Sequence, residues 1–94
     1  MENETMEQLK ERLNSSSKYL QSNDMRVIDV HEGYAKVEMI IDEQILNGHG
    51  FVHGGALFSL GDTAAGAASF ATGRDSVTLS ASINYIKPGI GGKL

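Results

Sequence analysis

The segment "NGHGFVHGGALFSLGD", residues 47–62, decides the fold of this chain. It places two histidines and four glycines directly before a run of small apolar residues, and one carboxylate, Asp62, falls inside that run. Clustered glycines are typical of a backbone that must come close to another group. A lone acid among alanines and leucines suggests chemistry. The segment therefore predicts a glycine-rich entry into a helix that carries a reactive side chain.

The helix is predicted by the sequence "ALFSLGDTAAGAASFA", which is rich in Ala and Leu. With the two glycines before it, the helix covers about 54–71, and Gly73 provides a C-terminal stop. The sixteen residues 56–71 extend roughly 24 Å as a helix, which is too short to span a bilayer, and Asp62 is too polar for one. Because the residues are apolar nearly all round, we expect this helix to be buried inside the protein.

The flanking sequence predicts a second helix and three strands. Apolar residues at helical spacing indicate a helix over about 4–14, and two strand-like runs with a glycine between them indicate a hairpin over about 25–42. An alternating run indicates a strand over about 76–87, which Pro88 ends. We therefore expect residues 1–94 to form a single α+β domain.

The composition limits the partners of this domain. The 94 residues carry a formal net charge of -4 and have no cluster of Lys and Arg, so nucleic acid is not an expected partner. The lack of cysteine excludes a disulfide framework and a thiol nucleophile. The first residues are acidic and amphipathic, unlike those of a signal peptide. We therefore expect a cytoplasmic protein with no membrane partner.

Three common glycine and histidine motifs do not fit residues 47–62. A dinucleotide fingerprint begins here, but His53 stands at its third glycine position. The glycine spacing of a P-loop is present, but Ala56 and Leu57 replace the lysine and the hydroxyl residue that bind phosphate and magnesium. His49 and His53 are four residues apart, but the neighbouring glycines disfavour the rigid helical face that a metal pair needs. We therefore expect no metal site.

The first turn of the predicted helix offers a different chemistry. Free backbone N–H groups at Gly54 and Gly55 would point at an incoming oxygen, as in an oxyanion site. Asp62 lies about 10 to 12 Å further along the same helix, so both groups cannot reach one carbonyl. Two antiparallel helices across a two-fold axis would bring them together twice, and the small residues Gly61 and Ala65 would let such helices approach closely. The sequence therefore predicts a homodimer with two shared sites.

Structural roles for the same residues remain open at this point. Asp62 is also consistent with a structural acid held by neighbouring hydroxyl groups. His53 fits a hydrogen-bonding residue at a helix start, and Asn47 fits a turn former. Thr78 fits an ordinary strand residue.

Four segments together resemble one family. "GYAKVEMII", Asn47, "HGGALFSLGD" and "SINYIKPG" occur in the order seen in the PaaI-like branch of the hotdog-fold acyl-CoA thioesterases, and the resemblance covers roughly residues 20–94. It implies a long central helix wrapped by an antiparallel sheet. It also implies hydrolysis of an acyl-CoA or aryl-CoA thioester without a metal or an organic cofactor, in homodimers that often pair into dimers of dimers.

The resemblance implies roles for six residues: Asp62, Asn47, Gly54, Gly55, His53 and Thr78. Asp62 would act as a nucleophile or as a general base on water, and Thr78 would help to hold that water. The two glycines would polarise the thioester carbonyl, while Asn47 and His53 would order the loop before the helix. The glycines would come from one subunit and the carboxylate from the other.

The sequence departs from the family in one respect, which leaves alternatives open. The family sheet has further strands after the "KPG" turn, and these are missing from the 94 residues, so we expect an incomplete sheet. The rival hypothesis is a non-catalytic acyl-CoA-binding or oligomerisation remnant of a hotdog protein. A hotdog hydratase is disfavoured, because its acid and base should lie closer together than Asp62 and His53.

Overall fold

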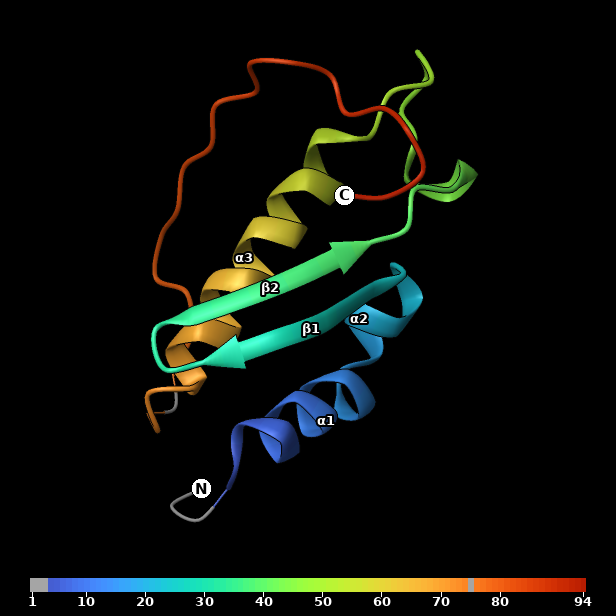
Figure 1. Cartoon of the computed structure of the whole chain (residues 1–94). Helices are drawn as coiled ribbons and strands as arrows, with labels where there is room; N and C mark the ends of the chain where they lie inside the picture. The colour runs from blue at the N-terminus through green and yellow to red at the C-terminus, as the bar shows by residue number, and fades with distance from the viewer. Residues whose placement is uncertain (1–3, 75) are drawn as a thin grey trace.

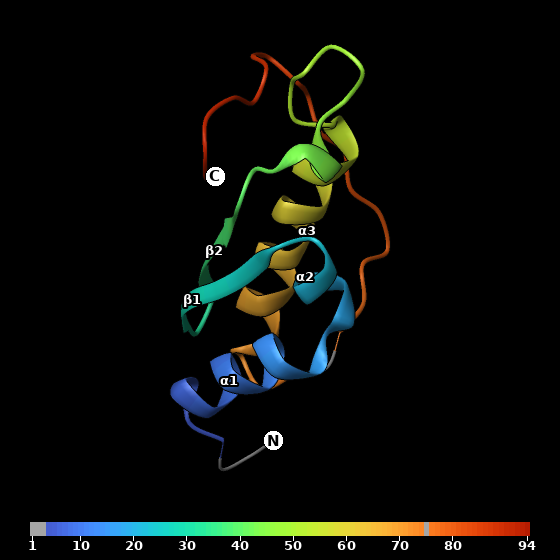
Figure 2. The ribbon, with the colours of Figure 1, turned by 90° about the vertical axis from the view of Figure 1, so that its right-hand side faces the viewer.

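The computed structural model describes residues 4–74 and 76–94, and its elements lie in two layers around one long helix (Figure 1). The elements are α1 (Met6–Ser16), α2 (Lys18–Ser22), β1 (Met25–His31), β2 (Tyr34–Met39), the 3-10 turn η1 (Glu43–Ile45) and α3 (Gly54–Phe70). The strands form an antiparallel sheet that covers one side of α3 (Figure 2), and α1 packs against β1 (Figure 1). This arrangement confirms the predicted class, a long helix packed on an antiparallel sheet with an N-terminal helix.

Helix α1 starts and ends through side-chain hydrogen bonds. Thr5 and Gln8 form a capping box at its start, so the helix begins two residues later than the predicted range of about 4–14. Leu9 is buried at its centre. Near its end, the Asn14 amide donates to the Val27 carbonyl at 2.8 Å and accepts from the Val27 N–H at 2.7 Å. This side chain therefore pairs with β1 as a neighbouring strand would.

The hairpin turns at the predicted glycine. Gly33 has a φ of 74°, which a side chain would disfavour, and His31 pairs with Tyr34 across the turn. The register shifts between Val27 and Asp29, where a bulge interrupts the ladder. The strands end at Met39, three residues before the predicted limit of 42.

The core lies between α1, the hairpin and α3. Its buried residues are Leu9, Leu20, Met25, Val27, Val30, Met39, Ile45, Val52, Ala67 and Ala71. Only one of them, Ala67, belongs to α3. The predicted burial of the whole helix is therefore wrong for the single chain, in which Gly61, Asp62 and Ala65 are exposed. The physical reason is that a sheet of two strands covers only one side of a helix.

The predicted strand over 76–87 is also wrong. These residues are extended and form no backbone–backbone hydrogen bond with any other described residue. They run back along α3 on the side opposite to β1 and β2 (Figure 2), so no strand lies next to them. The chain then returns to the sheet, where Leu94 exchanges backbone hydrogen bonds of 2.8 and 2.9 Å with Met39. Within the described residues, no helix has the length and apolar character to cross a membrane.

Candidate functional site

The start of α3 is held by His53. Its Nδ1 atom accepts a hydrogen bond from the Gly55 N–H at 2.8 Å, so His53 is the N-cap of the helix. The Gly55 N–H, which the sequence offers as a donor to an incoming oxygen, is therefore already engaged. The Gly54 N–H has no acceptor among the described residues. One free backbone donor, rather than two, remains at this helix start.

The loop before α3 is ordered by Asn47. The Asn47 side-chain oxygen accepts from the N–H groups of His49 and Phe51, at 2.9 and 3.1 Å, and the Asn47 N–H donates to the Phe51 carbonyl at 2.7 Å. Gly50, with a φ of 83°, makes the tight turn inside this loop. The Asn47 Nδ2 group donates to none of the described residues and is free to meet a ligand. Asn47 thus orders the loop through its side-chain oxygen and backbone N–H and leaves its Nδ2 group available as a hydrogen-bond donor.

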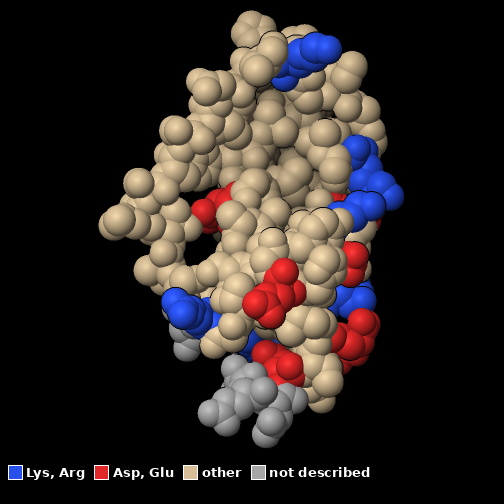
Figure 3. Space-filling model, turned by 60° about the vertical axis from the view of Figure 1, so that its left-hand side comes forward, with Lys and Arg blue, Asp and Glu red and all other residues tan. Residues whose placement is uncertain are grey.

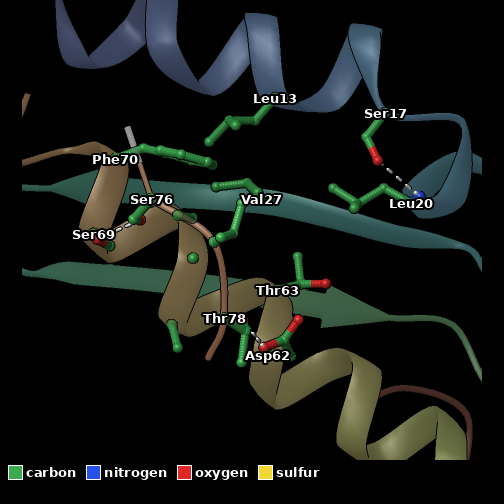
Figure 4. Close-up of a pocket in the computed structure, with 14 residues that line it drawn as sticks. Leu13, Ser17, Leu20, Val27, Asp62, Thr63, Ser69, Phe70, Ser76 and Thr78 are labelled. Atoms are coloured by element: carbon green, nitrogen blue, oxygen red, sulfur yellow. Dashed lines mark hydrogen bonds between the residues drawn. The ribbon is translucent and has the colours of Figure 1, made fainter. Parts of the chain in front are cut away.

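Asp62 and Thr78 form the second part of the site. Asp62 lies in the middle of α3, and the Thr78 hydroxyl donates to its Oδ1 atom at 2.6 Å (Figure 4). A similar contact joins Ser69 of α3 to Ser76, at 2.8 Å. These two hydrogen bonds fasten the extended segment to the helix. Asp62 itself is exposed in the single chain, and its second oxygen is available to water or a substrate.

A pocket of about 660 Å³ opens beside this carboxylate. Its walls come from α1, α2, β1, α3 and the extended segment, and Leu13, Leu20 and Phe70 lie along it while Asp62, Thr63 and Thr78 lie together at one part (Figure 4). Asp62 is the only carboxylate among the described residues that line the pocket. Figure 3 shows the hollow between the extended segment and the body of the molecule, with acidic atoms exposed within it. An apolar group of moderate size would fit here with its polar end at Asp62.

The two parts of the site do not meet within one chain. Gly54 and Asp62 are eight residues apart on the same helix, which corresponds to about 12 Å. His53 and Asn47 lie at the start of α3, whereas Thr78 is hydrogen-bonded to the Asp62 carboxylate. No group of three or more histidine and acidic side chains of residues 4–74 and 76–94 is placed to bind a metal ion.

Tyr85 contacts the candidate site, and the sequence did not single it out. Its hydroxyl donates to the Gly54 carbonyl at 2.9 Å, and its ring lies against Gly54. In the sequence it appeared only as one more apolar-face residue of the alternating run 76–87. The signal that could have found it is the hydroxyl on a residue otherwise placed with aliphatic neighbours.

Known proteins resemble the chain in both sequence and structure. The sequence pattern of the thioesterase superfamily matches residues 49–94. The acyl-coenzyme A thioesterase PaaI of Escherichia coli is 42% identical over 66 residues, which cover 70% of this chain and 47% of that protein. A solved structure of a conserved Pseudomonas aeruginosa protein has a TM-score of 0.76 at 36% identity, covering 82% of this chain and 64% of that one. The solved E. coli PaaI protein, from the phenylacetic acid degradation operon, has a TM-score of 0.74 at 33% identity, covering 90% and 67%.

These likenesses, with the helix and sheet described above, define a protein of the hotdog-fold class. Within that class, the chain belongs to the PaaI-like family of the thioesterase superfamily, as its motifs indicated. The chain spans about half the length of the curated relatives it matches.

Proposed function

We propose that this chain is an acyl-CoA thioesterase whose site is shared across a homodimer. The observation that carries the proposal is the Asp62–Thr78 hydrogen bond of 2.6 Å at the edge of an apolar pocket. A carboxylate with one oxygen held by a hydroxyl keeps the other oxygen for reaction. Membership of the thioesterase superfamily makes a thioester the natural substrate.

The chemical role of Asp62 is to deliver an oxygen nucleophile to the thioester carbonyl. As a general base, it takes a proton from water while that water's oxygen forms a bond to the carbonyl carbon, and the carbon–sulfur bond then breaks. The products are the carboxylic acid and the CoA thiol. Direct attack by the Asp62 carboxylate would give an anhydride that water then hydrolyses to the same products. In either case Thr78 orients the attacking oxygen through its hydrogen bond to Asp62.

The carbonyl must meet hydrogen-bond donors while Asp62 attacks. The Gly54 N–H is free and lies at the positive end of α3, and the Asn47 amide is free nearby in the sequence. Since about 12 Å separates Gly54 from Asp62 in one chain, the donors come from a partner subunit. Two α3 helices packed head to tail through their exposed small residues would form two such sites. These dimers would in turn pair into tetramers.

The pocket favours an aryl or a medium-chain acyl group. Its volume of about 660 Å³ suits a group of that size, and apolar side chains such as Leu13, Leu20 and Phe70 form its walls. One relative carries the name of the phenylacetic acid degradation operon, which makes phenylacetyl-CoA the first substrate to test. We place the reaction in the cytoplasm, where CoA thioesters are formed and consumed.

A second candidate function is acyl-CoA binding or self-association without turnover. The exposure of Asp62 in the single chain favours it, because water is not excluded from this carboxylate. The two candidates differ in whether substrate binding is followed by release of thiol.

The proposal predicts hydrolysis that depends on Asp62. Free thiol should appear when the purified chain is given phenylacetyl-CoA, hydroxybenzoyl-CoA or medium-chain acyl-CoAs. Asp62→Asn should lower kcat at least about a hundredfold, because it removes the base and keeps the shape. Asp29→Asn, which changes an exposed acid of β1 outside the site, is the matched control and should be unaffected. Equal and negligible rates for all three proteins, with binding retained, would favour the second candidate.

A further inference from the structure

Tyr85 and His53 contact the two ends of one peptide group at the start of α3. The peptide that joins Gly54 to Gly55 contributes the Gly54 carbonyl and the Gly55 N–H. Its carbonyl accepts from the Tyr85 hydroxyl at 2.9 Å, and its N–H donates to His53 Nδ1 at 2.8 Å. The three groups therefore form one chain of hydrogen bonds from Tyr85 through the peptide to His53.

The position of Tyr85 depends on the glycine beneath it. A Cβ atom placed on Gly54 would lie 3.1 Å from Tyr85 Cζ and 3.4 Å from its hydroxyl oxygen, closer than side chains normally approach. Glycine at this position lets the ring lie flat against the backbone. The contact also comes from a segment that is far from Gly54 in the sequence and that holds Thr78 at the carboxylate. One extended segment thus reaches both parts of the site.

The chain of hydrogen bonds fixes the state of the imidazole. Because Nδ1 accepts a hydrogen bond, the neutral ring carries its proton on Nε2. Donation into the peptide carbonyl polarises that peptide and strengthens the N–H that holds Nδ1. His53 is exposed, so the Nε2–H group is open to a ligand. The helix start then presents two donors, the Gly54 N–H and His53 Nε2–H.

From this geometry we infer that Tyr85 is a positioning residue, which acts through the Gly54–Gly55 peptide to keep His53 in the Nε2–H form beside the Gly54 donor. This inference rests on the proposed thioesterase function. Tyr85 touches no reacting atom in this scheme. In this scheme His53 Nε2–H joins the Gly54 N–H and the Asn47 amide as a donor to the thioester oxygen, and Tyr85 orders the imidazole that carries it.

The test uses the whole chain and the variant Tyr85→Phe, which removes the hydroxyl and keeps the ring. In the wild type, the ring nitrogens of His53 should show the Nε2–H tautomer by two-bond ¹⁵N–¹H correlation. In Tyr85→Phe, the Gly55 amide proton should move to lower frequency and the Nδ1–H tautomer of His53 should become populated. With phenylacetyl-CoA, kcat should fall about fivefold, the effect of an ordinary hydrogen bond, while KM stays within about twofold.

Tyr34→Phe is the matched control, since Tyr34 lies at the hairpin turn, stacked on His31 and away from the site. It should change neither kcat nor the two spectroscopic signals. Unchanged Gly55 and His53 signals in Tyr85→Phe would overturn the hydrogen-bond chain, and changed signals with an unchanged kcat would overturn the positioning role. If the wild type released no thiol, the proposed function would fail. The chain of hydrogen bonds would still be tested by the His53 tautomer, which should change in Tyr85→Phe and stay unchanged in Tyr34→Phe.

Discussion

At the scale of single residues, the proposed reaction depends on how the oxygens of Asp62 are used. Thr78 donates to Oδ1, which leaves Oδ2 for water, so the hydroxyl fixes which oxygen is the base. Thr78→Val keeps the shape of the side chain and removes this donor. We expect kcat to fall about tenfold with little change in KM, since a hydrogen bond to a charged group is lost. Thiol release measured against Thr72→Val, which removes an exposed hydroxyl just beyond the end of α3, gives the comparison.

The sequence named most of the residues of the candidate site but not all of their contacts. The spacing along the helix was enough to predict that Gly54 and Asp62 lie too far apart to act on one carbonyl. The family resemblance was enough to predict that Thr78 lies near Asp62. Two acceptors can compete for one N–H donor, and a sequence does not show which of them wins. The sequence therefore could not show that His53 accepts the hydrogen bond of the Gly55 N–H. Tyr85 was missed because its role depends on where an extended segment runs, which the alternating pattern does not specify.

At the scale of elements, the attachment of α1 to β1 depends on one amide. Asn14 satisfies both the N–H and the carbonyl of Val27, a residue that is only 1% exposed. Asn14→Ala would leave these two groups without partners next to the core. We expect a loss of about 1 to 3 kcal/mol in the free energy of unfolding, measured by urea titration. Ser15→Ala, on the same helix but exposed, should change stability by less than about 0.5 kcal/mol.

The corner between α2 and the end of the sheet should respond to pH. Protonated Asp24 donates a hydrogen bond to the neighbouring Asp42 carboxylate, which raises the pKa of Asp24 above its ordinary value of 3.8. Gln44 Nε2 lies 3.2 Å from an oxygen of each acid. Since the folded state binds this proton more tightly, its stabilisation is full below pH 3.8 and is lost as pH rises through the raised pKa of Asp24.

Asp24→Asn removes this titration and keeps a hydrogen-bonding side chain. The difference in stability between variant and wild type should therefore shift in favour of the variant as the pH rises from about 3.5 to about 7. Urea midpoints at the two pH values measure the difference, and any constant effect of Asn at this positive-φ position cancels. Asp42→Asn should change the pH dependence in the same direction, because it removes the carboxylate that raises the pKa of Asp24. A difference that stays constant with pH in both variants would contradict the assignment.

The elements themselves were largely predictable, while their pairing was less so. Helical spacing and capping residues are local, so α1 and α3 lie within two residues of the expected ranges. A strand needs a neighbour, and alternation in "SVTLSASINYI" cannot say whether one is present. Residues 76–87 therefore kept the extended backbone expected of a strand without its ladder.

At the scale of the whole molecule, the single chain exposes apolar surface that the proposed dimer would cover. Large apolar side chains of the extended segment are almost fully exposed, with Val77 at 94%, Leu79 at 98% and Ile86 at 87%. Gly61 and Ala65 have little or no side chain and are exposed, so the backbone of α3 around Asp62 is open to close approach. Soluble proteins rarely leave such apolar surface uncovered, so association of two chains here agrees with the shared site.

The most direct test of the shared site is complementation between two inactive variants. Asp62→Asn removes the carboxylate, and Gly54→Pro removes the free N–H at a helix position that tolerates proline, after a small shift of Tyr85. Mixed dimers would carry one site with both defects and one intact site. Each variant alone should therefore be inactive, and an equimolar mixture after subunit exchange should recover about a quarter of the wild-type rate. A mixture that stays inactive, while native mass spectrometry detects mixed dimers, would contradict a site built from two subunits.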